Sequence, residues 1–348
     1  TRYHGVTGVQ TCALPIFVVE DIPAREPSAH EIQIRVRFCG VCGTDVHIYE
    51  GAKGSAEVNP PVTLGHELSG DVSAVGVGVS RFRPGDRVCV APNAYCEKCY
   101  YCANGKKHLC THMVGLGTAA DGGFAEYVTV PEELVFPIAD GVSYEAAAMT
   151  EPISCCLHGM DLTQVRLGDT VMVVGTGNIG LIMVQLARHA GAATIIAVEP
   201  NPARLEKARQ LGADICIDPL HDDTGAVLRE NGVCCIDKVI DCAGRVDTNE
   251  YSVHWAGRGA TVMLFGLTAP DECMRLKPFE VFQKELTIKG SFVNPDAFER
   301  AGRLLACGVV KTERIVSDIV PLDEIDSVFS QRLYARDGKV LIRCTDET

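Results

Sequence analysis

The sequence lacks an excess of basic residues, because 32 lysines and arginines are outnumbered by 45 aspartates and glutamates, giving a net charge of −13. Nucleic acids and anionic membranes select basic surfaces, so we expect neither as a partner. Low-complexity runs are also missing, and 47% of the residues are hydrophobic against 22% charged, as in a folded protein. The expected ligand is therefore a small molecule.

Uninterrupted apolar runs are missing too, and we expect no secretory signal peptide. The most apolar stretch, residues 170–187, is broken by three glycines and Asn178, so we expect no membrane span. Without a secretory signal, the 17 cysteines are expected to be thiols or metal ligands in a reducing compartment, which favours the cytoplasm. The length of 348 residues predicts two domains.

The first residues are a separate case. The segment VTGVQTCALPI at 6–16 resembles the translation of a common sequencing adapter. We therefore expect residues 1–16 to be a non-native N-terminal scar in place of the natural first strand, and to be disordered or poorly packed. Cys12 is excluded from the chemistry for this reason.

A strand followed by spaced glycines lies near the middle of the chain. In VMVVGTGNIG, residues 171–180, four apolar residues precede a G-x-G-x-x-G spacing. This spacing predicts a tight turn, room for a pyrophosphate and a helix start whose N–H groups face the anion. The predicted phosphate-binding residues are Gly175, Gly177, Asn178, Ile179 and Gly180.

An acidic residue follows this motif at the distance typical of a residue that binds the ribose hydroxyls. Glu199 ends a second apolar strand, TIIAV, 19 residues beyond Gly180. An acid there binds ribose hydroxyls and repels a 2′-phosphate, which favours NAD over NADP. Arg204 either stacks near the adenine or is a solvated residue at a helix start. The alternative for the whole segment is an ordinary βαβ unit with a surface glutamate.

The predicted pattern of secondary structure changes at about residue 150. Before it, short alternating runs such as EIQIRVRFCG and RPGDRVCV, separated by Gly and Pro, predict a β-rich lobe, a small barrel. After it, strands and helices alternate, and KVIDCAG and ATVMLFGL extend a doubly wound parallel sheet of the α/β class.

Four cysteines in the first lobe are spaced C-x2-C-x2-C-x7-C. Four thiolates this close can surround one tetrahedral Zn²⁺ and leave no position open, which predicts a structural site. An iron–sulfur cluster is the alternative, but no Pro follows the last cysteine; unligated thiols are the other. The four residues are Cys96, Cys99, Cys102 and Cys110.

A second group of possible ligands is dispersed over three segments. Cys42 lies in GVCGTDVH, His66 and Glu67 lie in GHE, and Glu151 lies in TEP. Cysteine, histidine and carboxylate together suit a zinc ion that keeps a position open for water or substrate. Each residue alone could be an ordinary buried group.

Together, GVCGTDVH, GHELSG, the cysteine loop, GDRV, TEP and the glycine motif resemble, in this order, the zinc-dependent medium-chain alcohol dehydrogenases. The resemblance covers roughly residues 17–348, and the chain looks most like the polyol (sorbitol or L-iditol) dehydrogenase branch. It implies a discontinuous GroES-like catalytic domain, residues 17–154 with 295–348, that binds both zinc ions. It also implies a Rossmann NAD-binding domain at residues 155–294.

The resemblance implies a catalytic zinc on Cys42, His66 and either Glu67 or Glu151, with the two carboxylates able to exchange or to act through a water. Many alcohol dehydrogenases of this family have a cysteine in place of Glu151. The rival third ligands are Cys155 and Cys156. Cys39, which forms a C-x2-C with Cys42, is interpreted as a packed thiol.

The resemblance also assigns a proton relay and the nicotinamide contacts. Thr44 and His47 resemble the family's relay, a hydroxyl beside the alcohol and an imidazole nearer solvent; the alternatives are a turn threonine and a surface histidine. The expected residues near the nicotinamide are Phe265, Gly266, Leu267, Phe292, Val293 and Asn294.

These features predict a zinc-dependent oxidoreductase that oxidises a secondary alcohol of a polyol to a ketone with hydride transfer to NAD. An L-threonine 3-dehydrogenase, whose branch GTDVHIYE also resembles, and a butanediol-type dehydrogenase are the enzyme alternatives. A non-catalytic sensor that binds zinc and NAD is the alternative of another class. The family resemblance implies a homo-oligomer, a dimer or tetramer.

Overall fold

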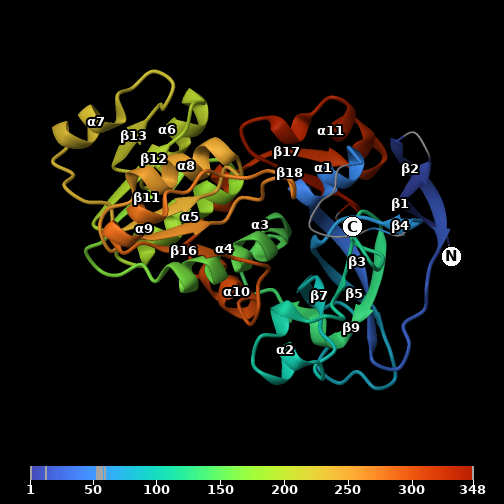
Figure 1. Cartoon of the computed structure of the whole chain (residues 1–348). Helices are drawn as coiled ribbons and strands as arrows, with labels where there is room; N and C mark the ends of the chain where they lie inside the picture. Colours follow the sequence, from blue (N-terminus) through green and yellow to red (C-terminus); the bar gives the residue numbers. More distant parts are fainter. Residues whose placement is uncertain (1, 12–13, 52–57, 59, 347–348) are drawn as a thin grey trace. The chain divides into compact units, whose positions relative to one another are not determined.

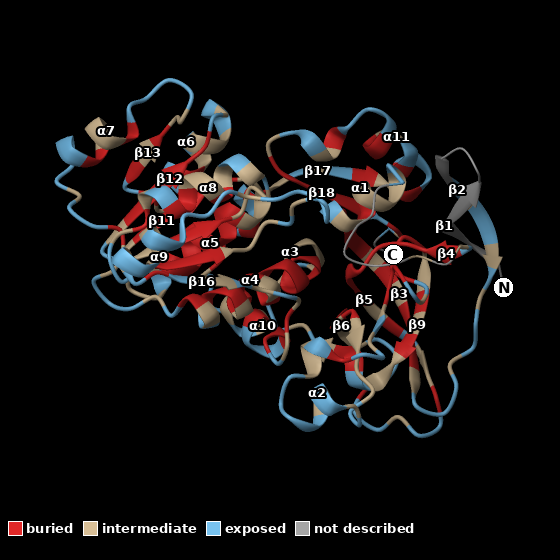
Figure 2. Ribbon diagram, viewed as in Figure 1, coloured by how far each residue is buried: buried red, intermediate tan, exposed pale blue. Residues whose placement is uncertain are grey.

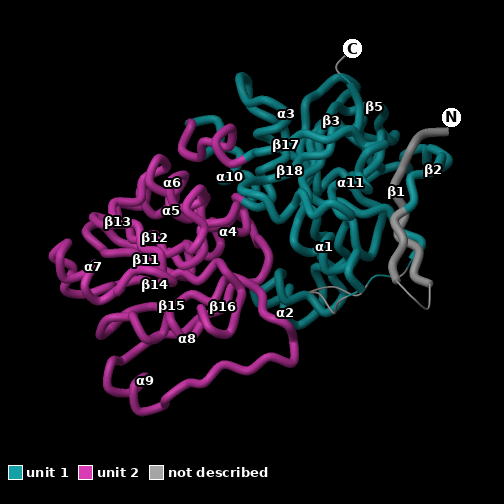
Figure 3. Tube along the Cα trace, turned by 90° about the horizontal axis from the view of Figure 1, so that it is seen from above, with its two compact units in different colours: residues 1–152, 298–307, 316–348 teal, residues 153–297, 308–315 magenta. Residues whose placement is uncertain are grey.

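The computed structural model describes residues 2–11, 14–51, 58 and 60–346. The chain divides into two compact units (Figure 3). The expected domain limits at 154 and 295 lie within three residues of the observed ones, but residues 308–315, expected in the catalytic domain, group with unit 2. Unit 1 comprises Thr1–Pro152, Phe298–Cys307 and Val316–Thr348, and unit 2 comprises Ile153–Ala297 and Gly308–Ile315.

Unit 2 (Figure 1) is built around a six-stranded parallel sheet in the order β13-β12-β11-β14-β15-β16, all labelled in Figure 3. Counted from β11 this is 3-2-1-4-5-6, the order of dinucleotide-binding folds. Strands β11 and β12 are apolar and buried after their first residues, as the red ribbon in Figure 2 shows. Strands covered on both faces read as continuous apolar runs, and the predicted Rossmann fold is confirmed.

The elements of unit 2 are β11 (Thr170–Val174), α5 (Asn178–His189), β12 (Thr194–Val198), α6 (Pro202–Gln210), β13 (Ile215–Ile217), α7 (Thr224–Glu230), β14 (Lys238–Asp241), α8 (Val246–Trp255), β15 (Thr261–Leu264), α9 (Pro278–Lys284), β16 (Thr287–Gly290) and the 3-10 helix Thr312–Arg314. Helix α4 (Thr150–Thr163) begins in unit 1 and continues into unit 2.

The main sheet of unit 1 has the order β10-β6-β5-β3-β18-β17, with β9 also paired to β3. Only the β17–β18 pair is parallel among these described pairings. Ile32, Ile34 and Val36 alternate along β3, so they share one face, and all three are fully buried in the core. The predicted β-rich lobe is confirmed, and β18, close to the end of the chain, completes its sheet.

The elements of unit 1 are β1 (Arg2–Thr11), β2 (Leu14–Pro23), β3 (Glu31–Gly40), α1 (Gly43–Tyr49), β4 (Val62–Thr63), β5 (Glu67–Val75), β6 (Arg87–Val90), β7 (Asn93–Ala94), α2 (Tyr100–Ala103), β8 (Val114–Gly115), β9 (Tyr127–Pro131), β10 (Val135–Pro137), α3 (Tyr144–Ala148), α10 (Phe298–Ala306), β17 (Val316–Pro321), α11 (Ile325–Ser330) and β18 (Lys339–Arg343). Short 3-10 helices occur at Lys107–Leu109, Glu132–Leu134, Leu322–Glu324 and Leu333–Ala335.

The N-terminal backbone differs from our expectation. Strand β1 pairs with β2 along its whole length and also with β4. The expected disorder of residues 1–16 is therefore wrong for the described backbone, because two ten-residue strands can satisfy each other's hydrogen bonds. Cys12 lies outside the described residues, and the non-native origin of the segment stays a prediction.

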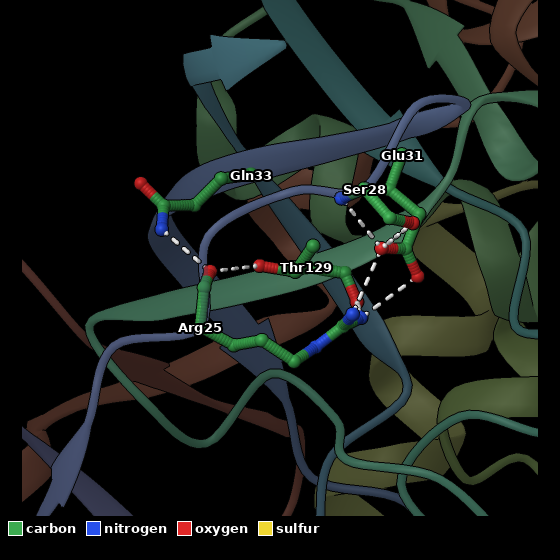
Figure 4. A network of polar contacts seen from close by, with 5 residues as sticks. All are labelled: Arg25, Ser28, Glu31, Gln33 and Thr129. Carbon is green, nitrogen blue, oxygen red and sulfur yellow. Dashed lines mark hydrogen bonds and ion pairs between the residues drawn. The ribbon is translucent and has the colours of Figure 1, made fainter. Parts of the chain in front are cut away.

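The segment between β2 and β3 is held by a polar network (Figure 4). Arg25 donates to both carboxylate oxygens of Glu31 at 2.8 Å, and the Ser28 hydroxyl donates to Glu31 at 2.5 Å. Gln33 and Thr129 each donate to the Arg25 carbonyl at 3.0 Å. The hydrogen bonds from Arg25 lower the pKa of Glu31 to about 2. This network ties the segment to β3 and β9.

None of the helices in the described part of the chain has both the length and the apolar content needed to span a membrane.

Candidate active site and metal centres

Three of the dispersed candidate ligands meet in unit 1. Cys42 directly precedes α1, His66 directly precedes β5, and Glu67 is the first residue of β5. Strand pairing brings these segments together, because Glu67 is the partner of Gly40, two residues before Cys42. One ligand atom from each of Cys42, His66 and Glu67 lies within 4.8 Å of the others.

Asp45 was missed by the sequence reasoning, although it lies within the quoted motif. It is fully buried on α1 and accepts a 2.8 Å hydrogen bond from the backbone N–H of Cys42. Its other oxygen lies 3.8 Å from Nδ1 of His66. Burial raises the pKa of Asp45, while the charge of His66 opposes this. Asp45 thus fixes the backbone of Cys42 and places its second carboxylate oxygen beside the His66 ring.

Lys339 on β18 was also missed, and it forms an ion pair with Oε2 of Glu67. Both side chains are at most 4% exposed. Gly40 makes room for the pair, because a Cβ there would lie 2.3 Å from Oε2 of Glu67 and 2.8 Å from Cε of Lys339. Burial lowers the pKa of Lys339, but Glu67 and Cys42 outweigh it, so the pKa is raised and the ammonium stays charged.

Glu151 is buried in the first turn of α4. Its charge contributes to raising the pKa values of His66 and Lys339, so it belongs to the same electrostatic environment. Among the described residues, however, neither Glu151 nor Cys155 or Cys156 is part of the group within 4.8 Å.

Cys39 is fully buried, and a Cβ on Gly65 would lie 2.8 Å from its sulfur. Burial raises the pKa of Cys39 well above its usual value. These surroundings are those of a packed thiol.

The dispersed group fits a cation. Burial lowers the pKa of His66, but Cys42 and Asp45 outweigh it and raise the pKa well above its usual value. The site therefore favours positive charge. The facing atoms Nδ1 of His66 and Oδ1 of Asp45 are buried without a hydrogen-bond partner among the described residues. A sulfur, an imidazole nitrogen and a carboxylate oxygen form a donor set that zinc uses where one position stays open.

Thr44 and His47 lie three residues apart on α1, so they share one face of the helix. Both are half-buried. Because α1 begins directly after Cys42, a short helix and the residue before it carry a ligand candidate and both relay candidates.

The four cysteines of the loop also meet. Sulfur atoms of Cys96, Cys99, Cys102 and Cys110 all lie within 4.8 Å of one another. The backbone N–H groups of Cys96 and His112 each donate to the Cys110 sulfur at 3.4 Å.

The hydrogen bonds in this loop favour thiolates at some of the sulfurs. Backbone N–H groups of Cys102 and Thr111 lower the pKa of Cys99 to about 5, and that of Cys96 lowers the pKa of Cys110. Desolvation, and then its cysteine neighbours, raise the pKa of Cys102 to about 12. Four thiolates at this distance require a cation, and four sulfur ligands suit structural zinc.

The glycine motif forms the expected turn at the carboxyl end of β11. Gly175 has φ +81°, and a Cβ there would lie 2.9 Å from Ala243. A Cβ on Gly180 would lie 2.0 Å from the Gly175 carbonyl, whereas Gly177 faces open space. Helix α5 begins at Asn178, with Ile179 in its first turn. The bare backbone and the helix start leave room for a phosphate group.

Glu199 lies beside this turn, directly after β12. Its buried carboxylate accepts hydrogen bonds from the backbone N–H groups of Thr176 at 2.9 Å and Asn201 at 3.0 Å. These contacts fix the acid next to the glycine turn. Arg204 is half-buried in the first turn of α6.

The loops after β14 and β15 interlock. The backbone N–H groups of Phe265 and Gly266 donate to the Asp241 carbonyl at 2.9 and 2.8 Å. A Cβ on Gly266 would lie 2.2 Å from the Gly244 nitrogen. The ring of Phe265 packs against Gly159, and Leu267 is exposed.

Asp241 was not singled out from the sequence. Its buried carboxylate accepts hydrogen bonds from Ala243, Gly244, Asn249 and Ser252 at 2.9–3.3 Å. It therefore fixes the loop at the carboxyl end of β14.

The segment after β16 contains an unusual backbone conformation. Val293 has φ +48°, a region that β-branched residues rarely occupy. The next residue, Asn294, is buried and donates a 2.7 Å hydrogen bond to the Ser154 hydroxyl, while Phe292 is 41% exposed. Strain of this kind is often found at functional sites.

Comparisons with known proteins indicate the family of the chain. The model for the alcohol dehydrogenase GroES-like domain matches residues 28–140, and the zinc-binding dehydrogenase model matches residues 178–307. A sorbitol dehydrogenase of Halalkalibacterium halodurans is 35% identical over 95% of this chain and 96% of its own length. An L-threonine 3-dehydrogenase of Anaeromyxobacter sp. (strain Fw109-5) is 33% identical, covering 94% of this chain and 95% of its own.

A solved structure from Sinorhizobium meliloti 1021, described as a zinc-binding dehydrogenase bound to NADP, has 35% identity, a TM-score of 0.92 and 99% coverage of both chains. Both sequence and fold thus match along almost the whole chain. The chain belongs to the zinc-dependent medium-chain alcohol dehydrogenase family.

Proposed function

We propose that this dehydrogenase oxidises a secondary alcohol of a polyol, of the sorbitol or L-iditol type, to a ketone and transfers the hydride to NAD. The observation that carries the proposal is the group of Cys42, His66 and Glu67, whose ligand atoms lie within 4.8 Å. Three protein ligands leave a position for an alcohol oxygen. The sorbitol dehydrogenase among the relatives supports a polyol substrate.

Cys42, His66 and Glu67 would hold the catalytic zinc, with Glu151 acting from nearby, and the cysteine loop would hold the structural zinc. A zinc ion at the catalytic place supplies Lewis-acid chemistry that lowers the pKa of an alcohol. Asp45 places a carboxylate oxygen beside the His66 ring, where carboxylates near metal-binding histidines are common. Lys339 offsets the charge of Glu67 and occupies one of its two oxygens.

The proton released by the alcohol passes from the Thr44 hydroxyl to the His47 imidazole. The two side chains are successive positions on one face of α1, which begins next to the ligand Cys42. A hydroxyl can accept and donate a proton, and an imidazole nitrogen can take one up.

NAD would bind at the carboxyl ends of the strands in unit 2. Gly175, Gly177 and Gly180 with the start of α5 hold the pyrophosphate, and Glu199 accepts hydrogen bonds from the ribose hydroxyls. Arg204 would lie near the adenine. The segments after β15 and β16, with the strained Val293, hold the nicotinamide.

A substrate panel tests the proposal. Zinc-loaded protein is mixed with NAD and sorbitol, xylitol, galactitol, butanediol or L-threonine, and NADH absorbance is followed. We expect the highest kcat/KM with a polyol. Absence of turnover with every alcohol would refute the proposed activity, while a strong preference for L-threonine would identify the alternative that the relative supports.

The coenzyme preference has its own test. Glu199→Gln keeps the side-chain size but removes the charge that would repel a 2′-phosphate. We expect the ratio of kcat/KM for NAD to that for NADP to fall roughly tenfold, as the loss of one charge-assisted contact predicts. An unchanged ratio would exclude Glu199 as the discriminating residue. The oligomeric state and the cytoplasmic location stay predictions.

A further inference from the structure

A pair of adjacent cysteines lies in unit 2 away from the residues proposed to bind NAD. Cys234 and Cys235 are both exposed and occupy the loop between α7 and β14. The other adjacent pair, Cys155 and Cys156, is built into helix α4, where consecutive side chains point about 100° apart. Cys234 and Cys235 lie outside helices and strands, and both residues line one cavity.

The two cysteines line a cavity of about 250 Å³. Its wall includes Leu228, Arg229 and Trp255, the single tryptophan of the chain. The sulfur of Cys235 packs against Gly257, where a Cβ would lie 2.3 Å away. The cavity thus combines two thiols with an aromatic, an aliphatic and a cationic residue.

Backbone hydrogen bonds hold the loop on both sides of the pair. The N–H of Val233 donates to the Leu228 carbonyl at 2.9 Å, and the N–H of Gly257 donates to the Ile236 carbonyl at 3.0 Å. The thiols are therefore presented from anchored backbone. Ordering costs less when a site is held in place before the ligand arrives.

We propose that Cys234 and Cys235 form a dithiol site for soft, thiophilic ligands, of which aryl-substituted trivalent arsenic is the best match. Two sulfur–arsenic bonds form, the bond from arsenic to its oxygen breaks, and the two thiol protons leave with that oxygen as one water. Arsenic stays trivalent, so no oxidant is required. The aryl group lies on the apolar wall beside Trp255.

The site is distinct from the dinucleotide residues. Residues 231–237 precede β14 and residues 256–260 precede β15, so the cavity lies at the amino ends of these strands. The glycine motif and Glu199 follow β11 and β12 at the carboxyl ends of the same parallel sheet. The dithiol proposal does not rest on the proposed function.

Titration of the zinc-loaded full chain with phenylarsine oxide tests the proposal. We expect one arsenical per chain at low reagent concentration and a change in Trp255 fluorescence. Cys234→Ser and Cys235→Ser should each weaken binding by roughly 100-fold, because the second bond is an intramolecular step only when both thiols are present. Cys273→Ser, which removes an exposed but solitary thiol, should change nothing.

Unaltered affinity in either single serine variant would overturn the proposal, as would an equal fluorescence change in the double variant. An adduct mapped to other cysteines in the wild-type chain would overturn it as well. Melting temperatures of the variants show whether each is folded, and both substitutions are at exposed positions where folding should be retained.

Discussion

The two candidate metal centres of unit 1 are assembled in opposite ways. The cysteine loop takes four sulfur ligands from residues 96–110. The dispersed centre takes Cys42 from the start of α1 and His66 and Glu67 from the start of β5, and its counter-charge comes from Lys339 on β18. The first centre depends on a local fold of the chain, whereas the second depends on correct pairing of β3, β5 and β18.

The two centres also balance charge differently. In the loop, backbone N–H groups lower the pKa values of Cys99 and Cys110, and three of the four cysteines are only partly buried. In the dispersed centre, buried side chains face each other, with Lys339 against Glu67. Removing one member of a buried charged group leaves its partner uncompensated. We therefore expect a substitution in the dispersed centre to lower activity and stability more than a substitution in the loop.

The largest expected effect follows from Cys42→Ser, which removes a ligand of the dispersed centre alone. We expect kcat/KM to fall roughly 10³-fold or more, because zinc chemistry supplies several kcal/mol of charge stabilisation. Elemental analysis should show loss of the catalytic zinc and retention of the loop zinc. Cys39→Ala is the matched control and should keep both ions. Equal zinc loss from both centres in Cys42→Ser would contradict the proposal that the two centres bind zinc independently.

Lys339→Met breaks the buried ion pair and should destabilise unit 1 by about 3–5 kcal/mol, because Glu67 is left buried without its counter-charge. Urea unfolding measures the loss, and titration with Co²⁺ measures metal affinity independently of activity.

The double variant Lys339→Met with Glu67→Gln provides the control for this pair. It should recover part of the stability lost in Lys339→Met, because no uncompensated charge remains. Strictly additive losses would show that the two side chains do not interact.

Cys99→Ser should release the loop zinc and lower the melting temperature less than Lys339→Met does, since a local loop is loosened while the sheet stays paired. The turnover number per folded molecule should stay near that of the wild type. Thermal melting, zinc analysis and kcat measured at low temperature test this. A loss of activity as large as that of Cys42→Ser would argue against a purely structural loop.

The smallest effect is expected at the local network of Figure 4. The pKa of Glu31 is lowered from 4.5 to about 2, so its contribution to stability is present above pH 4.5 and is lost as the pH falls toward 2. Arg25→Ala should cost about 1 kcal/mol or less at pH 7, because Arg25 is 57% exposed.

Unfolding of wild type and Arg25→Ala compared between pH 7 and 3 checks this sign. The difference between their free energies of unfolding should become smaller below pH 4.5. Arg83→Ala, which removes a 3.6 Å ion pair on an 88% exposed arginine, should have a smaller effect at every pH. A difference in unfolding free energy that grows in acid would contradict the assignment of the low Glu31 pKa to Arg25.

Some features were readable from the sequence because their spacing has a direct geometric meaning. The G-x-G-x-x-G motif predicted a turn that only glycines allow, and the observed φ of +81° at Gly175 and the crowding at Gly180 are the physical reasons. The C-x2-C-x2-C-x7-C spacing likewise predicted a compact sulfur cluster. In both cases the interacting atoms belong to one short segment.

Other features of the site were left open by the sequence or were not identified from it. The choice between Glu67 and Glu151 was left open, and of the two only Glu67 lies within the described group of ligand atoms. Lys339 received no attention because it lies 272 residues beyond Glu67. The disorder expected for residues 1–16 was wrong for the described backbone because resemblance to an adapter says nothing about whether a segment can pair as a hairpin.

The amino-acid sequence by itself determined the family, the two domains' fold classes and the groups of residues able to hold zinc and a dinucleotide. Tertiary structure alone decided which of Glu67 and Glu151 lies in the ligand group with Cys42 and His66, and which cation compensates Glu67. The reason is physical: spacing controls distances within one turn or loop, whereas contacts between distant segments exist only after the strands have paired.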